Sequence, residues 1–273
     1  MDKIEENKEM KYIYIVGSGH SGSTLFDLAL SNQNGIFSLG EFRHVQSEWI
    51  NNHLCACGVP MLSCPIWPEV LGEFSKEELW IIASRDYHRK KGPHDLPARF
   101  VEIYPRFLEK LSEVTGCSVI SDSSKSLHKL NLITLLPNLD LRILYLRRDV
   151  GGVAASQKRK GKSAWKSSLS WIARNVQIQQ YLKHSGRPWS EVRYEELVLN
   201  PEKELEKIFQ FLEIELKSSL VNDFSKLRHI VKGNRIRESH TELTFRKPSV
   251  WQDNFSPLGL GYYRALDSLL TLF

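Results

Sequence analysis

The chain has 273 residues, of which 41% are hydrophobic and 25% charged, and these are the proportions of an ordinary globular protein. Its formal net charge of +5 suits an anionic ligand, but it lacks the dense basic stripe of a nucleic-acid-binding protein. The first residues, MDKIEENKEMK, contain no apolar signal segment, and no apolar run approaches the roughly 18 residues of a membrane span. We therefore expect a cytoplasmic protein that has no membrane span and binds no nucleic acid.

Strands and helices alternate along the predicted chain. Short apolar runs predict strands at 12–16, 36–39, 118–121, 141–146 and 191–193, and helical patterns cover 25–30, 100–111, 127–136, a stretch from about 150, 165–176 and 205–212. In the helix at 165–176 we expect a buried face made of Trp165, Leu169, Ile172 and Val176. Such alternation predicts an α/β fold of three layers, in which helices cover both faces of a mostly parallel sheet.

Residues 43–91 have no clean period and contain three cysteines, three tryptophans and several prolines. We expect this stretch to be an irregular insertion in a single domain that spans residues 1–273.

The strongest local signal is the glycine loop, which we define as residues 17–24 (GSGHSGST), between the first strand and the first helix. Glycines let consecutive backbone amides face one anion, and the following helix N-terminus adds a partial positive charge. Gly17, Gly22 and Thr24 fit the P-loop pattern G-x-x-x-x-G-K-[ST], but Ser23 replaces its lysine. Because that lysine holds the outer phosphates of a triphosphate, the loop favours a smaller anionic group.

Two further polar segments follow predicted strands, where ligands bind in open α/β sheets. Arg148 and Asp149 come directly after one strand, and Ser156 lies about two turns along the next helix. The segment 121–126 (SDSSKS) follows another strand and places Lys125 at the head of a helix. Each segment alone is a weak signal, because paired arginines and helix-capping serines are common.

Together these segments resemble the sulfotransferase superfamily that uses 3′-phosphoadenosine-5′-phosphosulfate (PAPS), most closely its bacterial and tyrosylprotein-sulfotransferase-like branch. The family's 5′-phosphosulfate loop, PRSGTTL, is similar to residues 19–25 (GHSGSTL). The family's other motifs match Arg148-Asp149 with Ser156, Gly40-Glu41, the lysine segment 122–125 (DSSK), the phrase VRYEELVLNP at 192–201 and the Gly-Asn-x-x-Arg at 233–237. The resemblance runs from about residue 12 to residue 240.

The resemblance implies transfer of a sulfuryl group from PAPS to a hydroxyl or amine of an acceptor. A small-molecule acceptor, a metabolite or natural product, fits an expected cytoplasmic protein with no membrane span, while a glycolipid and a peptide tyrosine remain open. Adenosine 3′,5′-bisphosphate would be the second product. Glu41 would be the general base, and Lys125 would neutralise charge on the oxygen that bridges phosphate and sulfate. The acceptor pocket would be formed by residues 43–91 and their aromatic side chains.

The resemblance also implies a set of PAPS ligands. The 5′-phosphosulfate would be held by Gly19, His20, Ser21, Gly22, Ser23 and Thr24. Arg148 and Ser156 would bind the 3′-phosphate, and Arg237 would close over it. His20 stands where many relatives have arginine, so it would contact the sulfuryl oxygens with less fixed charge and would share in catalysis.

Several alternatives remain open from the residues alone. His44 and His128 are rival general bases, since histidine is the commonest one. A P-loop-like kinase or other nucleotide-binding protein is a rival function, although the loop lacks its lysine. The basic run Lys158–Lys166 fits a solvated surface, attraction of an anionic cosubstrate, or nucleic-acid binding, which the modest net charge disfavours.

Three cysteines, Cys55, Cys57 and Cys64, lie close to His53 in the sequence. Their C-x-C-x₆-C spacing lacks the paired C-x₂-C of common zinc sites. It favours free thiols packed with Met61 and Trp67. We accordingly expect no metal ligands in the chain.

Overall fold

The structure is a computed structural model that describes residues 10–33, 35–84, 95–215, 228–233, 252 and 255–270. Its strands are β1 (Met10–Gly17), β2 (Ile36–Gly40), β3 (Val119–Asp122), β4 (Leu139–Arg147) and β5 (Trp189–Arg193). Its α-helices are α1 (Ser23–Ser31), α2 (Val45–Ile50), α3 (Trp67–Leu71), α4 (Lys76–Ala83), α5 (Leu96–Thr115), α6 (Leu127–Ile133), α7 (Val150–Lys158), α8 (Ala164–His184), α9 (Tyr194–Leu199), α10 (Pro201–Leu212) and α11 (Pro257–Leu269), with 3₁₀ turns at Phe42–His44 and Met61–Ser63.

The five strands form one sheet in the order β2-β3-β1-β4-β5, and all four neighbouring pairs are parallel. The predicted strands are therefore confirmed, each with slightly different bounds. The chain first crosses from β1 to β2 on one side and later continues from β3 to β4 on the other. This reversal leaves a crevice at the carboxyl ends of the central strands, where open α/β sheets bind ligands.

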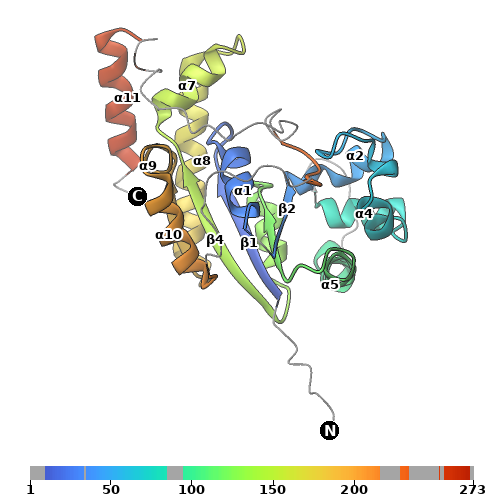
Figure 1. The fold of residues 1–273 in the computed structure, drawn as a ribbon. Helices are drawn as coiled ribbons and strands as arrows, with labels where there is room; N and C mark the ends of the chain where they lie inside the picture. The colour runs from blue at the N-terminus through green and yellow to red at the C-terminus, as the bar shows by residue number, and fades with distance from the viewer. Residues whose placement is uncertain are drawn as a thin grey trace.

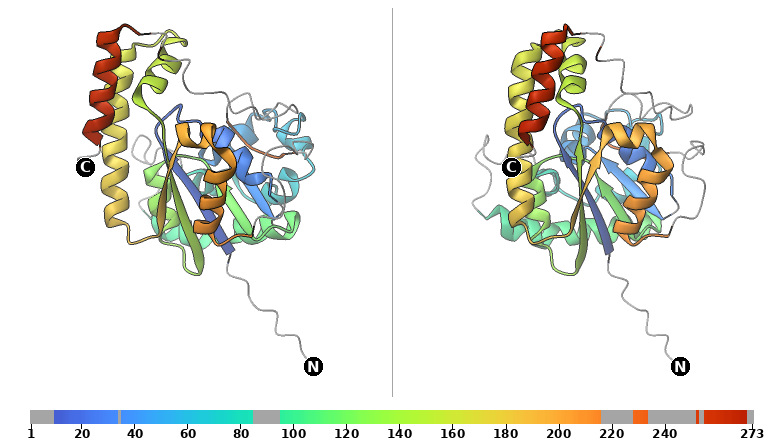
Figure 2. Two further views of the ribbon diagram at one scale, coloured as in Figure 1. Left: turned by 60° about the vertical axis from the view of Figure 1, so that its left-hand side comes forward. Right: turned by 90° about the vertical axis from the view of Figure 1, so that its left-hand side faces the viewer.

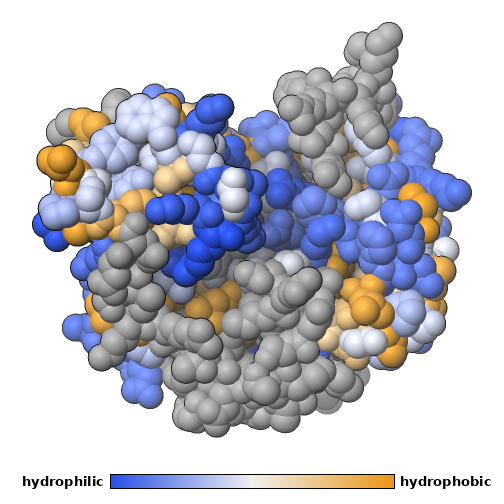
Figure 3. Space-filling view, turned by 90° about the horizontal axis from the view of Figure 1, so that it is seen from above, coloured by the Kyte–Doolittle hydropathy of each residue, from blue (hydrophilic) through white to orange (hydrophobic). Residues whose placement is uncertain are grey.

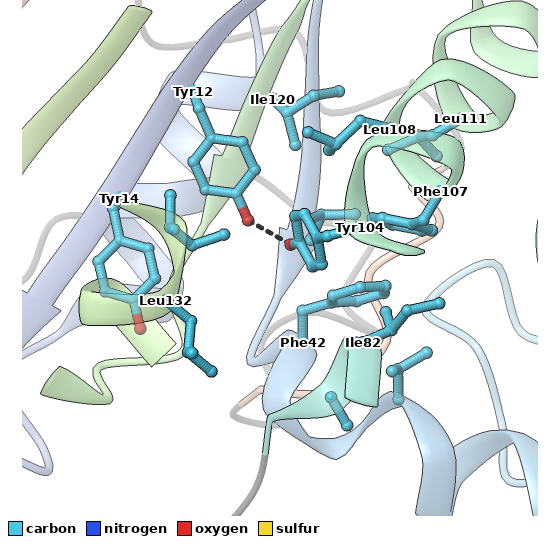
Figure 4. Close-up of a cluster of buried hydrophobic side chains, with 14 of the residues drawn as sticks. Tyr12, Tyr14, Phe42, Ile82, Tyr104, Phe107, Leu108, Leu111, Ile120 and Leu132 are labelled. Carbon is cyan, nitrogen blue, oxygen red and sulfur yellow. Dashed lines mark hydrogen bonds between the residues drawn. The ribbon is translucent and has the colours of Figure 1, made fainter. Parts of the chain in front are cut away.

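Side chains of β1 alternate between two hydrophobic cores, one on each face of the sheet. Tyr12, Tyr14 and Val16 pack toward α5, α6 and α8, whereas Ile13 and Ile15 pack toward α1, α9 and α10. Figures 1 and 2 show helices on both sides of the sheet, so the predicted three-layer α/β fold is confirmed. Figure 4 shows the first core, in which the hydroxyls of Tyr12 and Tyr104 are hydrogen-bonded at 2.7 Å.

The described part of the stretch 43–91 combines short helices with an irregular segment at 51–66. Its helices are α2, α3 and α4, which pack beside α5 (Figure 1). Helix α4 begins with a capping box in which the Ser75 hydroxyl accepts from the Glu78 amide and the Glu78 carboxylate accepts from the Ser75 amide. These helices are short, and short helices leave little periodic signal in a sequence.

The predicted buried face of α8 is partly wrong. Trp165 and Leu169 are exposed, while Ser168, Trp171, Asn175, Ile178 and Leu182 are buried. Trp165 instead stacks on Tyr262 of α11, a helix that the sequence analysis did not predict. Although α8 is 21 residues long, it is not apolar enough to cross a bilayer, and neither is any other helix among the described residues.

Candidate active site

The glycine loop joins β1 to α1 at the carboxyl edge of the sheet. Its backbone turns at His20 and Gly22, whose φ angles of 66° and 92° lie in the left-handed region. No side chain caps the N-terminus of α1, and its first turn has no acidic residue. The buried hydroxyls of Ser18 and Ser21 have no hydrogen-bond partner among the described residues. Buried polar groups without a partner are costly, so these two hydroxyls are available to donate to a group outside the chain.

Arg148 follows β4 and points back to the glycine loop. Its Nη1 donates to the His20 carbonyl oxygen at 3.2 Å, and its guanidinium lies 4.4 Å from the centroid of the Tyr194 ring. The buried Nε has no acceptor, and no carboxylate of a described residue lies within 4.0 Å of the guanidinium. The guanidinium is therefore held by an aromatic ring and a backbone carbonyl rather than by a carboxylate.

Ser156 lies two turns into α7, on the same face as Gly152 one turn earlier. A Cβ at Gly152 would stand 2.9 Å from Nε of Arg148, so the arginine side chain crosses this face of the helix. Ser156 is half-buried. Gly152 and Ser156 therefore share the face of α7 that the Arg148 side chain crosses at Gly152, and the pairing of Arg148 with Ser156 stays a prediction.

Glu41 and Lys125 lie in contact. Nζ of Lys125 donates to Oε1 of Glu41 at 2.9 Å, and Arg43 and His44 lie 3.4 and 3.8 Å from Oε2. Burial alone would raise the pKa of Glu41, but the charges of Lys125 and Arg43 outweigh it and hold the pKa below its usual range. Glu41 is thus ionised at neutral pH.

The turn that carries Lys125 is held from two sides. Lys125 has a φ of 59°, and its carbonyl oxygen accepts from Nη2 of Arg174 at 2.5 Å. The next residue is Ser126, whose carbonyl oxygen accepts from the Tyr14 hydroxyl at 2.8 Å and whose amide donates to the same hydroxyl at 3.1 Å. Tyr14 and Arg174 therefore aim the lysine at Glu41.

Most of the polar segment 121–126 serves the fold rather than the site. Asp122 accepts from the hydroxyl of Tyr12 at 2.9 Å and lies 3.2 Å from Nζ of the fully buried Lys129. Ser121 and Ser123 donate to the buried carboxylate of Asp27 on α1. Within this segment, Lys125 is the residue whose side chain contacts Glu41.

The three histidines considered for catalysis, His20, His44 and His128, lie in different places relative to Glu41. Burial, together with the charge of Lys160, lowers the pKa of His20 below its ordinary value, so its ring is neutral at pH 7. His44 lies beside Glu41, whereas His128 lies in the first turn of α6, after the Lys125 turn. Arg237 lies outside the described residues.

A cleft of 680 Å³ opens between the glycine loop, α7 and α8. Its lining includes Ser18, Gly19, Gln157, Lys162, Lys166 and Arg174. Figure 3 shows the molecule from above, with hydrophilic residues around the hollow at this edge. The expectation that aromatic residues of 43–91 line the pocket fails for Trp67, which is fully buried and stacked on Phe42.

Three supporting residues escaped the sequence analysis. Tyr14 sits inside a strand pattern, and Arg174 sits on an amphipathic helix, so neither carries a local signal. Tyr194 does belong to the phrase at 192–201, and its ring both stacks on Arg148 and fills the space that a Cβ at Gly22 would need.

A five-stranded parallel sheet with helices on both faces and a glycine loop at its carboxyl edge defines an α/β protein. The model of the sulfotransferase family matches residues 13–218, so the chain belongs to that family and the resemblance found in the sequence is confirmed. Family membership makes the chain a sulfuryl transferase.

Solved structures agree on the fold. A sulfotransferase domain from the olefin synthase of Synechococcus PCC 7002 superposes with a TM-score of 0.61 at 19% identity, over 94% of this chain and 92% of that domain. A sulfotransferase domain from the curacin biosynthetic pathway gives a TM-score of 0.57 at 17% identity, over 95% and 96%. No curated protein matches the sequence.

Proposed function

We propose that the chain transfers a sulfuryl group from PAPS to a hydroxyl or amine of a small-molecule acceptor and releases adenosine 3′,5′-bisphosphate. The observation that carries this proposal is the position of Arg148. Its guanidinium has no carboxylate partner among the described residues and contacts the backbone of the glycine loop. One anion site at the loop and a second at the arginine suit a nucleotide that carries phosphate on both its 5′ and 3′ oxygens.

In this proposal the amides of residues 19–24 and the hydroxyls of Ser23 and Thr24 hold the 5′-phosphosulfate. Arg148 and Ser156 hold the 3′-phosphate, and the motif at 233–237 assigns Arg237, which lies outside the described residues, to the same phosphate. His20 faces the sulfuryl oxygens as a neutral hydrogen-bonding ring. The orphaned hydroxyls of Ser18 and Ser21 support an anion in this loop.

The chemistry is a single in-line displacement. The acceptor atom attacks sulfur while the bond from sulfur to the bridging oxygen breaks, Glu41 takes the acceptor's proton, and Lys125 neutralises the bridging oxygen. The 2.9 Å contact supports both roles, because it places base and cation within one small site. A bound phosphosulfate competes for Lys125, and as that contact weakens the pKa of Glu41 rises, which makes it a stronger base.

Calorimetric titration tests the nucleotide. Adenosine 3′,5′-bisphosphate should bind without magnesium and more tightly than ATP with magnesium. A clear preference for magnesium-ATP would contradict the proposal and indicate a kinase. The acceptor is then sought with labelled PAPS and a compound library grouped by charge, since the cleft lining includes Lys162, Lys166 and Arg174.

A further inference from the structure

Three of the four cysteines and one histidine converge outside the candidate active site. The sulfurs of Cys55, Cys57 and Cys64 and a ring nitrogen of His229 all lie within 4.8 Å of one another. The Cys64 sulfur lies 3.8 Å from each of the other two sulfurs and 3.2 Å from Nδ1 of His229. We propose that these four residues form a structural zinc site, which we call the Cys₃His site.

The distances fit a tetrahedral metal centre. With Zn–S bonds of about 2.3 Å at tetrahedral angles, two sulfur ligands of one zinc ion lie about 3.8 Å apart. Cys64 has this separation from both Cys55 and Cys57. A disulfide brings its sulfurs to about 2.05 Å, and all four cysteines of the chain are unbridged.

Backbone amides support every sulfur of the Cys₃His site. The hydrogen bonds run from the amide of Cys57 to Cys55, from the amide of Val59 to Cys57, and from the amides of Ile66 and Trp67 to Cys64. Such N–H···S bonds favour the thiolate, which is the form that binds metals, and they fix its direction. Thiols packed only as small apolar groups need no such donors.

Charge explains why a cation belongs here. Cys55 and Cys64 are buried, and three thiolates at these separations repel one another strongly. A divalent ion removes that repulsion by taking the place of the thiol protons, which pass to solvent without any redox change. Four protein ligands fill a tetrahedral zinc ion, so the site is closed and structural rather than catalytic.

The histidine is not the one beside the cysteines in the sequence. Nδ1 of His53 lies 3.0 Å from a carboxylate oxygen of the buried Glu48, whose other oxygen accepts from Lys232 at 2.5 Å. His53 thus belongs to a polar network with Glu48 and Lys232. His229 is 165 positions from Cys64 and completes the ligand set, so the proposal replaces our expectation of free thiols.

The Cys₃His site ties two distant segments together next to Glu41. The Ala56 amide donates to the Ile230 carbonyl at 3.3 Å, and the Val231 amide donates to the Leu39 carbonyl at 3.2 Å. The next carbonyl, that of Lys232, accepts from the Glu41 amide at 2.8 Å. Zinc would therefore anchor the strip 228–233 that holds the backbone of Glu41.

Metal analysis of the intact protein tests the proposal directly. Protein purified without chelators should contain about one zinc per chain by plasma mass spectrometry. After anaerobic removal of zinc, Co²⁺ should bind with one equivalent and give the intense visible bands of a tetrahedral thiolate site. Wild-type protein that holds no stoichiometric zinc and takes up no Co²⁺ in reducing buffer would overturn the proposal, as would a disulfide among the three cysteines.

Matched variants locate the ligands. Cys57→Ser and His229→Ala should each lower zinc content well below one per chain, or weaken Co²⁺ binding at least tenfold. Cys117→Ser changes the one cysteine outside the cluster, and His53→Ala removes the nearby histidine, so both should retain full zinc. Loss of zinc in His53→Ala with retention in His229→Ala would contradict the assigned ligand set. If Cys57→Ser does not fold, the wild-type Co²⁺ spectrum still decides the question.

Discussion

Nζ of Lys125 lies 2.9 Å from Oε1 of Glu41, although 84 positions separate the two residues in the chain. The contact follows from the sheet, because β2 and β3 are parallel neighbours and their carboxyl ends reach the same edge. Glu41 follows β2 directly, and Lys125 follows β3 after a short turn held by Tyr14 and Arg174. The Glu41 carboxylate and the Lys125 ammonium are thus brought together by the topology of the sheet.

Replacing Lys125 with alanine should slow turnover by about 10²–10³-fold, the usual effect of removing one group that stabilises a leaving oxygen. The change should also release Glu41 from the cation that lowers its pKa. Because the ionised carboxylate is the active form, the acid limb of the kcat/KM profile should move to higher pH. Steady-state kinetics from pH 5 to 9 measure both effects.

The control for Lys125→Ala is Lys203→Ala, since Lys203 is an exposed lysine on α10. It should leave the profile unchanged. An acid limb that stays in place in Lys125→Ala, or moves to lower pH, would show that Glu41 is not the titrating base.

Strands were predictable because buried parallel strands have few polar residues, and β1 and β4 contain the uninterrupted apolar runs 12–16 and 143–146. The buried face of α8 was not predictable from the sequence, because it includes polar groups that find their hydrogen-bond partners only in the folded chain. Asn175 accepts from the Tyr145 hydroxyl at 2.7 Å, and the Trp171 indole donates to the Arg148 carbonyl at 3.0 Å. The spacing of hydrophobic residues in the sequence does not reveal buried polar positions of this kind.

In the candidate site, too, some contacts were predictable from the sequence and others were not. Glu41, Lys125 and Arg148 follow strands, and a sequence that predicts a parallel sheet also predicts that strand ends converge. The stacking of Tyr194 on Arg148 depends on how α9 packs beside the loop, and no spacing rule contains it. His229 lies beyond any local motif of the cysteines, and only the folded chain brings it to them.

Arg148→Ala should weaken binding of PAPS much more than binding of adenosine 5′-phosphosulfate. The latter lacks the 3′-phosphate, and a hydrogen bond to a charged group contributes about 1.5–3 kcal/mol, or about 10- to 150-fold. Competition titrations with both nucleotides measure the difference. Arg148→Lys keeps the charge but loses the planar fork, so its loss should be intermediate. Equal losses for the two nucleotides would remove the 3′-phosphate role.

Asp27→Asn should change how stability depends on pH. Burial raises the pKa of Asp27 from 3.8 to about 6, against the lowering effect of hydrogen bonds from Ser121 and Ser123. The folded state therefore binds more protons than the unfolded state in this window, and the free energy of unfolding falls as pH rises through it. The wild type should lose about 3 kcal/mol relative to the variant over the whole titration, from well below pH 3.8 to well above pH 6. Urea unfolding at a series of pH values measures this difference, and parallel curves would contradict it.

Glu41→Gln should preserve the fold and the affinity for PAPS while it lowers kcat by about 10²–10⁴-fold, the usual contribution of a positioned base. Glutamine keeps the shape and one accepting oxygen for Lys125 but takes no proton at neutral pH. A loss mainly in kcat marks a role in the transition state, whereas a rise in KM alone marks acceptor binding.

The size of the rate loss in Glu41→Gln depends on the acceptor that is used. A nucleophile that ionises easily, such as a phenol, needs little help from a base, so its rate should fall less than that of an alkyl alcohol. The ratio of the two losses therefore reports base catalysis separately from any change in geometry, which would slow both acceptors alike. Near-normal turnover of the alkyl alcohol by Glu41→Gln would transfer the role to His44, whose Nε2 lies 3.8 Å from the Glu41 carboxylate, or to His128. His44→Ala and His128→Ala then complete the set, and the base is the residue whose loss slows the alcohol most.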